Sequence, residues 1–301
     1  MMSRFMCGAG QNLRTPIPIH VRARRLIHRG VGAVLQRPPT RDDYLALRFL
    51  LRSRFLWKGL SAVRAVAQWR NDRAWMPADP PNPLQTFFDG RREGRGITKW
   101  RHYFDIYQRH FGRLRGREVH VLEIGVYAGG SLEMWRDYFG PRAHVYGVDI
   151  QPACKRFESE SVRISIGDQA DRDFWKQFKR ATPALDVVID DGGHAPQEQI
   201  VAFEELLPFL RSGGIYLVED IHGICNGFAM YVQGFAQALN AEAGMTQNPD
   251  DNERSVLCRT TALQSAVASV HLYPFVAVVE RTATPVVELV SARHGTQWEP
   301  F

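Results

Sequence analysis

Short apolar runs alternate with helical patterns through the middle of this chain. Five runs have the length and β-branched content of strands: Val119–Ile124, His144–Ile150, Ser161–Asp168, Leu185–Asp191 and Ile215–Asp220. Apolar residues recur at helical spacing between them, as in the segments around Trp135, Trp175 and Phe203. Alternating strands and helices are typical of right-handed βαβ units with a buried parallel sheet. We therefore predict an α/β fold with a doubly wound, Rossmann-like, mostly parallel sheet.

The pattern changes near the C-terminus. Two β-rich runs, Val270–Glu280 and Pro285–Val290, are separated by only four residues. Strands with so short a connection commonly pair as a hairpin. We expect the sheet to end in an antiparallel C-terminal hairpin.

The N-terminal part differs from both. Residues 1–41 contain no Asp or Glu and several prolines, and a helical apolar pattern runs from Leu45 to Ala67. Arginines interrupt this pattern too often for a membrane span. The proline-rich segment Pro77–Pro83 is the expected boundary. The prediction is a basic, partly helical N-terminal extension over 1–83 and a catalytic domain over 84–301.

Charge is distributed unevenly along the chain. The 301 residues carry a net charge of +6, but residues 1–75 hold fifteen Lys or Arg and three acids, so the remainder is acidic. Such an arm could meet an anionic membrane surface, a nucleic acid or an acidic partner, or dock on its own or a sister subunit in a homo-oligomer. Four scattered cysteines give neither a zinc-binding spacing nor a disulfide framework, which favours a cytoplasmic protein.

The first strand leads into a glycine turn, from Glu123 to Ser131. The turn differs from the Gly-x-Gly-x-x-Gly of pyrophosphate binders. An acid at the strand end repels a phosphate and suits a cation, and S-adenosylmethionine carries an ammonium, a sulfonium and no phosphate. Asp149 ends the second strand 24 residues after Gly125, about the offset at which a carboxylate reaches ribose hydroxyls. The turn and the acid together predict a nucleoside cofactor.

Acidic residues stand at the end of all five strands: Glu123, Asp149, Asp168, Asp190 with Asp191, and Glu219 with Asp220. Ligands of doubly wound sheets gather at these ends, so the side chains should converge on one crevice. Asp191, Glu219 and Asp220 could offer oxygen ligands to Mg²⁺, which would polarise a hydroxyl. His194, on a glycine turn, could accept the hydroxyl proton.

Structural explanations stand beside these functional ones. Asp190 could cap the following helix, His194 could be a packed or solvent-facing residue, and the Glu219–Asp220 pair could bind backbone amides. For any single residue the structural explanation is as good as the functional one. The presence of all these residues at the ends of successive strands favours a functional site.

Five motifs together resemble the class I S-adenosylmethionine-dependent methyltransferases that include the macrolide sugar O-methyltransferases of mycinamicin and tylosin biosynthesis, with the cephalosporin-hydroxylase-type proteins as a related branch. The motifs are Glu123–Ser131, Tyr146–Asp149, Ile166–Gln169, Asp190–His194 and Val218–Asp220. The resemblance covers about residues 96–222. The loop Ile221–Gly227 departs from the family pattern, so acceptor contacts there are not transferable.

The resemblance implies that Asp191, Glu219 and Asp220 hold Mg²⁺ and that His194 is the general base. It also implies that Trp100, His102 and Tyr103 close over the cofactor. The remaining candidates for the S-adenosylmethionine site are Glu123, Gly125, Tyr127, Gly129, Ser131, Asp149, Asp168, Gln169 and Asp190.

The function expected from residues and resemblance is Mg²⁺-assisted O-methylation of a sugar or glycosylated natural product. A catechol-like small molecule is one alternative, because both acceptors offer a hydroxyl pair that chelates the metal. A nucleic-acid-binding or membrane-binding protein that uses the basic arm is another. The chain has no recognisable nucleic-acid reader and no Asn-Pro-Pro-aromatic motif for amino-group methylation, which argues against nucleic acid.

Overall fold

A computed structural model of the chain describes residues 81–247 and 255–295. The predicted N-terminal extension, with its helix from Leu45 to Ala67, lies almost entirely outside the described residues. Its proposed contacts with a membrane surface or a sister subunit stay predictions. Among the described residues, no helix is long and apolar enough to cross a membrane.

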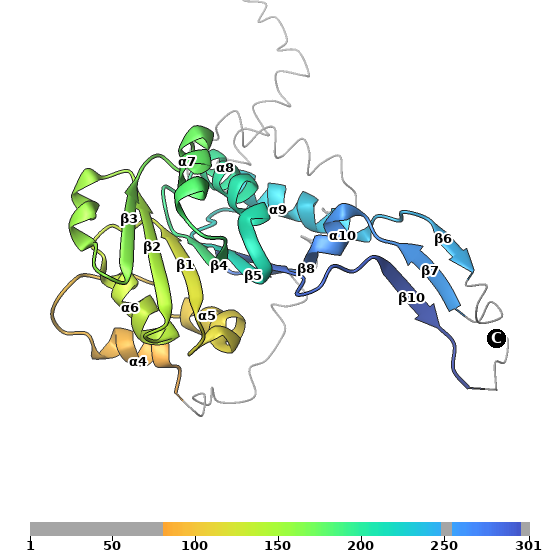
Figure 1. Cartoon of the computed structure of the whole chain (residues 1–301), viewed down its shortest axis with the longest axis horizontal. Helices are drawn as coiled ribbons and strands as arrows, with labels where there is room; N and C mark the ends of the chain where they lie inside the picture. The colour runs from red at the N-terminus through yellow and green to blue at the C-terminus, as the bar shows by residue number, and fades with distance from the viewer. Residues whose placement is uncertain (1–80, 248–254, 296–301) are drawn as a thin grey trace, which may run out of the picture. The chain divides into compact units, whose positions relative to one another are not determined.

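A seven-stranded sheet forms the centre of the described part (Figure 1). Its strand order is β3-β2-β1-β4-β5-β9-β8, in which β1 to β5 are parallel and β9 runs antiparallel to both neighbours. The strands are β1 Val119–Ile124, β2 Ala143–Asp149, β3 Val162–Ile166, β4 Leu185–Asp190, β5 Leu210–Val218, β8 Val267–Tyr273 and β9 Val276–Arg281. The predicted doubly wound, mostly parallel sheet is confirmed.

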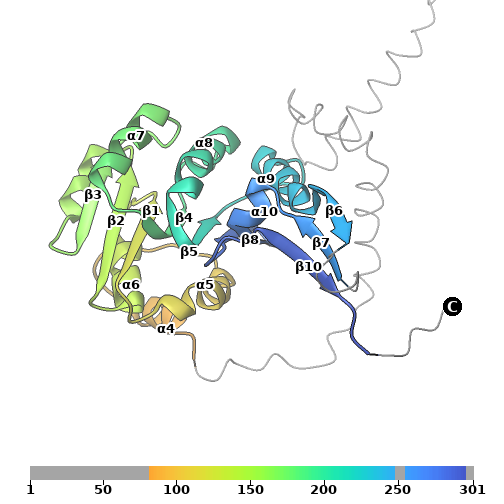
Figure 2. The ribbon, with the colours of Figure 1, turned by 45° about the vertical axis from the view of Figure 1, so that its right-hand side comes forward.

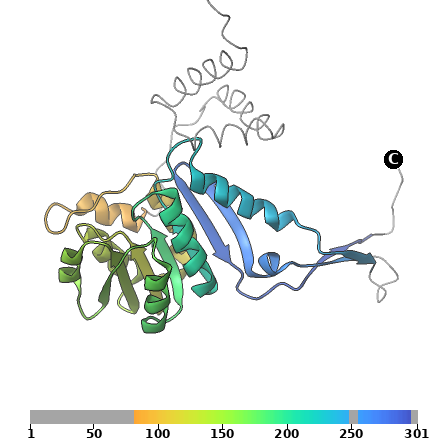
Figure 3. The same ribbon diagram turned by 90° about the horizontal axis from the view of Figure 1, so that it is seen from above.

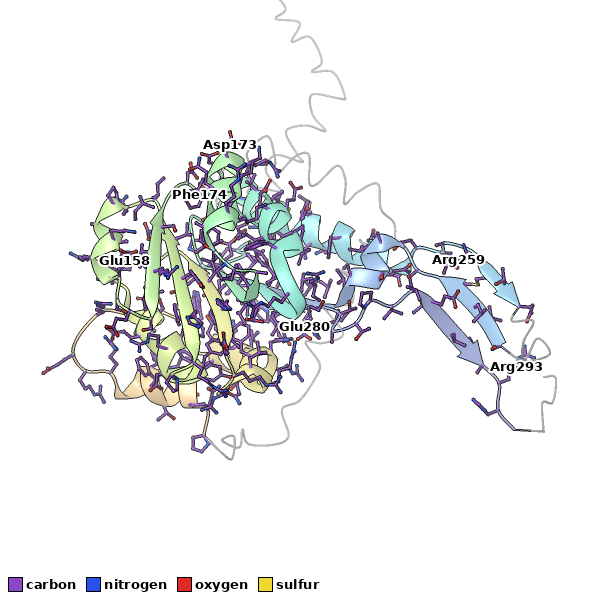
Figure 4. The ribbon with its side chains drawn as sticks, in the orientation of Figure 1. Glu158, Asp173, Phe174, Arg259, Glu280 and Arg293 are labelled. Atoms are coloured by element: carbon purple, nitrogen blue, oxygen red, sulfur yellow. The ribbon has the colours of Figure 1, made fainter. Side chains whose placement is uncertain are left out.

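Helices cover both faces of this sheet (Figure 2). One face packs against α4 Pro83–Gly90, α5 Tyr103–Phe111 and α6 Gly130–Phe139, and the other against α7 Arg172–Ala181, α8 Pro196–Leu206 and α9 Gly227–Gln237. Asp173 lies on the outer surface of α7, whereas Phe174 packs against the hydrophobic core between the sheet and helices α7, α8 and α9 (Figure 4). Short 3₁₀ turns complete the connections at Gly112–Leu114, Pro152–Phe157, Leu207–Phe209 and Ala238–Asn240.

The C-terminal strands pair differently from the prediction. The run Val270–Glu280 folds on itself, because Pro274 cannot donate to a strand ladder and β8 turns into β9 there. The other run contributes β10 Glu288–Ala292 to a separate antiparallel sheet with β7 Ser255–Arg259 and β6 Met245–Gln247, beside the short helix α10 Ala262–Ala266 (Figure 3). The antiparallel end of the main sheet is confirmed, but the predicted pairing of its hairpin was wrong.

The start of β5 also differs from the sequence interpretation. The segment Ser212–Gly214 has the composition of a turn, yet it lies inside β5, which begins at Leu210. The strand absorbs the glycines through a register shift against β4 between Leu185 and Val187. From Ile215 onward the pairing is regular and delivers Glu219 and Asp220 to the carboxyl end of the sheet.

Candidate active site

A cavity of about 430 Å³ opens at the carboxyl ends of the parallel strands. Its wall includes the glycine turn after β1, the loops after β2, β3 and β4, and the segment Gly96–Lys99 that precedes α5. Nine of the residues singled out in the sequence line it: Gly125, Tyr127, Ser131, Asp149, Asp168, Gln169, Asp191, His194 and Asp220. Residues from distant parts of the sequence therefore share one crevice.

The conformation of the glycine turn is set by the segments that pack against it, which leave no room for side chains at two positions. Gly125 has a φ of 90°, and a Cβ at this position would collide with the carbonyl oxygen of Asp191. Gly129 has a φ of 77°, caps α6 and leaves no room for a Cβ beside the ring of Phe157. Only glycine suits such positions. Gly129 therefore shapes the turn without lining the cavity.

Asp149 organises the same turn from the neighbouring strand. Its Oδ2 accepts hydrogen bonds from the backbone N–H of Val126 and of Tyr127, both at 2.9 Å, and its Oδ1 accepts one from Gln151 N at 2.8 Å. Tyr127 has a φ of 48°, and the residue is 86% exposed. The carboxylate thus fixes the backbone of the turn and stands in the cavity wall.

Gln169 joins the loops after β3 and β4. Its Oε1 accepts from Gly193 N at 2.8 Å, and its Nε2 donates to Asp190 Oδ1 at 3.2 Å. Asp168 caps its own loop through Ala170 N at 2.7 Å. Asp190 lies behind the wall and is fully buried, and burial raises the pKa of its carboxyl to about 7.

Two glutamates of the predicted set lie behind the wall as well. Glu123 is fully buried and accepts hydrogen bonds from Ser131 Oγ at 2.6 Å and Trp135 Nε1 at 3.1 Å. Glu219 accepts one from the Tyr107 hydroxyl at 2.6 Å. Burial, followed by the charge of Asp191, raises the pKa of Glu219 to about 8. Neither carboxylate lines the cavity.

Lys99 is the functional candidate that sequence reasoning missed. Its side chain is only 2% exposed, and its Nζ lies 2.6 Å from Asp191 Oδ2, 3.0 Å from Glu219 Oε2 and 3.6 Å from Glu123 Oε1. Burial works to lower the pKa of this ammonium, but the three carboxylates outweigh it and hold the pKa well above its usual range. The sequence held only an indirect signal for such a residue. Acids that converge in a buried place require a cation nearby.

Asp191, His194 and Asp220 form the edge of the cavity next to Lys99. His194 Nε2 lies 3.8 Å from Asp191 Oδ1 and 3.7 Å from Asp220 Oδ2, and one ligand atom of each residue falls within 4.8 Å of the others. His194 Nδ1 is buried without a hydrogen-bond partner among the described residues. His194 and Asp220 have φ angles of 58° and 56°, a strained conformation that clusters at functional sites.

Trp100, His102 and Tyr103 are not among the residues that line the cavity, and their closure over the cofactor stays a prediction. Trp100 Nε1 and the Tyr103 hydroxyl both donate to Asp220 Oδ1, at 3.1 and 2.7 Å. His102 Nε2 lies 3.0 Å from the carbonyl oxygen of Pro274, in the β8–β9 turn. The segment Gly96–Lys99 lines the cavity instead.

The known proteins that this chain resembles are methyltransferases. Residues 122–221 match the family described as a methyltransferase domain. Mycinamicin VI 2''-O-methyltransferase of Micromonospora griseorubida is 32% identical over 206 residues, which cover 62% of this chain and 49% of that protein. The 8-demethyl-8-alpha-L-rhamnosyl tetracenomycin-C 2'-O-methyltransferase of Streptomyces olivaceus is 34% identical over 214 residues, covering 62% and 53%.

A solved structure shares the fold. It is the MycE methyltransferase from the mycinamycin biosynthetic pathway in complex with Mg and SAH, with 28% identity and a TM-score of 0.53. The match covers 69% of this chain and 55% of that one. This chain therefore spans about half the length of the curated relatives it matches.

Proposed function

We propose that the protein is an S-adenosylmethionine-dependent, Mg²⁺-assisted O-methyltransferase, because its residues 122–221 match a methyltransferase domain. The acceptor is a hydroxyl of a sugar or glycosylated natural product. The observation that carries the proposal is one cavity lined by Asp149, from the end of β2, and by Asp191, His194 and Asp220, from beyond the ends of β4 and β5 on the other side of β1.

The cofactor side suits a nucleoside without phosphate. Carboxylates of Asp149 and Asp168 stand in the wall beside apolar Val148 and Ile150, which matches ribose hydroxyls next to a flat base. Gly125 lets the turn after β1 pack directly against the loop after β4, because a Cβ there would collide with the carbonyl oxygen of Asp191. When bound, S-adenosylmethionine supplies an electrophilic methyl group on a sulfonium.

The opposite side suits a hard dication. Asp191 and Asp220 face the cavity with oxygen ligands of the type that Mg²⁺ prefers, close enough to share one ion. Glu219 would contact the ion directly only by exchanging Lys99 Nζ for it, because that ammonium now lies between Glu219 and Asp191. When bound, the ion supplies a Lewis acid for a hydroxyl group.

His194 has the position of the general base. Its Nε2 stands between Asp191 and Asp220, so an imidazolium formed by taking the acceptor proton is stabilised by both carboxylates. Trp100 and Tyr103 hold Asp220 in place through its Oδ1. Lys99 limits the repulsion among the buried acids. In this arrangement His194 holds the proton of the acceptor hydroxyl, and the residues around it keep His194 and Asp220 in position.

The acceptor class comes from the relatives. Their names describe methylation of mycinamicin VI and of a rhamnosyl tetracenomycin, both glycosylated small molecules. A glycoside with two neighbouring hydroxyls would carry this chemistry here.

Transfer of a ¹³C-labelled methyl group tests the proposal. The full chain is incubated with methyl-labelled S-adenosylmethionine and Mg²⁺, and with methyl α-L-rhamnopyranoside, catechol or tRNA in separate samples. We expect an O-methyl NMR signal on the glycoside that disappears with EDTA. A signal on catechol alone would show that the acceptor is a catechol-like small molecule and not a glycoside. Labelled tRNA would show that the protein methylates nucleic acid and would contradict the proposal.

A further inference from the structure

We propose that three exposed aromatic side chains, Trp100, His222 and Phe275, form an acceptor subsite that takes the apolar face of a pyranose ring. We call this set the aromatic rim. The inference rests on the proposed function, because it assigns the place where the glycoside acceptor lies.

The rim gathers rings from three separate segments. The ring centroid of Phe275 lies 5.7 Å from that of Trp100 and 4.3 Å from that of His222, and Trp100 and His222 are 6.1 Å apart. Trp100 is 49% exposed and Phe275 36%, which is unusual for such large apolar side chains in contact with one another. The rings precede α5, follow β5 and occupy the β8–β9 turn, so only the folded chain brings them together.

Asp220 connects the rim to the candidate base. Its Oδ1 accepts from Trp100 Nε1 at 3.1 Å and lies 3.4 Å from His222 Nε2, whereas its Oδ2 lies 3.7 Å from His194 Nε2. A single carboxylate therefore has the rim on one side and the base on the other. A hydroxyl that reaches His194 brings its sugar ring next to Asp220, whose other carboxylate oxygen contacts the rim.

The backbone at Phe275 fixes the position of its ring. Phe275 has a φ of 65°, a conformation that favours glycine, and its carbonyl accepts a hydrogen bond from Ile221 N at 2.9 Å. Four non-glycine residues of the described chain have a positive φ: Tyr127, His194, Asp220 and Phe275. The first three line the cavity. At Phe275 the two-residue turn between β8 and β9 requires the positive φ, and this turn holds the ring beside Trp100 and His222.

The chemistry of the rim fits a sugar better than the other acceptors. A pyranose presents C–H groups on one face and hydroxyls at its edge, and aromatic faces attract C–H groups through their negative quadrupole. A 6-deoxy sugar adds a methyl group to the apolar surface. The nearby carboxylates of Asp191 and Asp220 disfavour an anionic acceptor. Three rings are also far too small an area for a stable protein interface.

The variant Phe275→Gly tests the rim without straining the fold, because glycine suits the positive φ. We expect the KM for methyl α-L-rhamnopyranoside to rise at least tenfold, with kcat within threefold and an unchanged Kd for S-adenosylmethionine. Leu272→Ala is the matched control, since Leu272 is an exposed apolar residue of the same hairpin outside the rim. This control should leave all three constants unchanged.

A binding readout keeps the rim distinguishable from the proposed reaction. Saturation-transfer NMR with methyl α-L-rhamnopyranoside should show contact with the wild type and with Leu272→Ala, and a strongly reduced signal with Phe275→Gly and Trp100→Ala. This result would support the rim even if methyl transfer failed. Equal signals in wild type and Phe275→Gly, or no signal in the wild type, would overturn it while leaving S-adenosylmethionine binding to stand or fall separately.

Discussion

The glycine-turn side of the cavity and its Asp220 side are built in opposite ways. On the glycine-turn side, one continuous segment with Asp149 supplies the wall, and its polar groups are hydrogen-bonded within the protein at 2.6 to 3.1 Å. On the Asp220 side, His194 stands 3.7 Å or more from the nearest carboxylates and one of its nitrogens has no partner among the described residues. A preformed wall suits binding, whereas incompletely paired groups suit proton transfer and cation binding.

Removing the proposed base gives the largest expected effect. His194→Ala should lower kcat for methyl transfer about 10³-fold, within the range for a general base, while the Kd for S-adenosylmethionine stays within twofold. Steady-state kinetics and calorimetry measure the two quantities. His144→Ala, at the opposite end of the sheet on β2, should leave kcat unchanged. Near wild-type kcat in His194→Ala would remove this residue from the mechanism.

Lys99→Met should produce the next largest effect, on stability. The substitution leaves Glu123, Asp191 and Glu219 without their buried cation, and breaking such a pair costs about 3–5 kcal/mol. Denaturant unfolding measures the loss. Lys155→Met is the control, because Lys155 pairs with Glu158 at the surface with its side chain 57% exposed, and it should cost less than about 1 kcal/mol. Equal losses in the two variants would contradict the organising role of Lys99.

Asp149→Asn should weaken the binding side alone. An amide cannot accept at both of its positions, so the turn through Val126 and Tyr127 loosens and a ribose partner is lost. We expect about a 100-fold weaker Kd for S-adenosylmethionine, equivalent to about 3 kcal/mol. With saturating cofactor, kcat should recover to within about threefold. Asp137→Asn, on the exposed side of α6, controls for the loss of charge. Unrecovered kcat would mean that the two sides are not separable.

The smallest expected effect is a pH dependence of stability centred on Asp190. Its pKa is about 7 in the folded protein and about 3.9 in an unfolded chain, so between these values the folded protein holds a proton that the unfolded chain has lost. Stability therefore falls as the pH rises from 5 to 8, by about 2.6 kcal/mol for this group. Asp190→Asn should remove that part of the slope.

The exposed Asp173 on α7 provides the comparison for this slope (Figure 4). Its pKa is lowered by hydrogen bonding to Lys176, so its contribution to stability is constant above about pH 5 and is lost only in more acidic solution. Asp173→Asn should therefore leave the slope between pH 5 and pH 8 unchanged. Unfolding curves at pH 5 and pH 8 for both variants decide the matter. An unchanged slope in Asp190→Asn would mean that its carboxyl is ionised throughout.

The two sides also differ in how far the sequence could predict them. The glycine turn and Asp149 follow from local patterns, since Gly125 marks the turn and one spacing places the acid. Asp191, His194 and Asp220 follow from the rule that parallel strands end at the same edge. Lys99 and Phe275 follow from neither, because burial of an ammonium and the position of a hairpin turn depend on contacts across more than ninety residues, such as Lys99 with Asp191.

Glu123 and Glu219 show a second limit. From the sequence, they resemble Asp191 and Asp220, acids at the ends of strands. The structure separates them by what packs around them: Trp135 and Tyr107 enclose the glutamates, and the aspartates stay open to the cavity. The sequence pattern predicts where each strand ends. Side-chain packing decides which carboxylates at those ends are buried and which face the cavity.

Calorimetric titration of the full chain with S-adenosylmethionine, with and without Mg²⁺, tests most directly whether one cavity holds the nucleoside on its Asp149 side and a dication on its Asp220 side. We predict one equivalent of S-adenosylmethionine bound per chain, and one Mg²⁺ that binds the wild type and is lost in Asp191→Asn. No binding of S-adenosylmethionine, or Mg²⁺ binding unchanged in Asp191→Asn, would contradict the account.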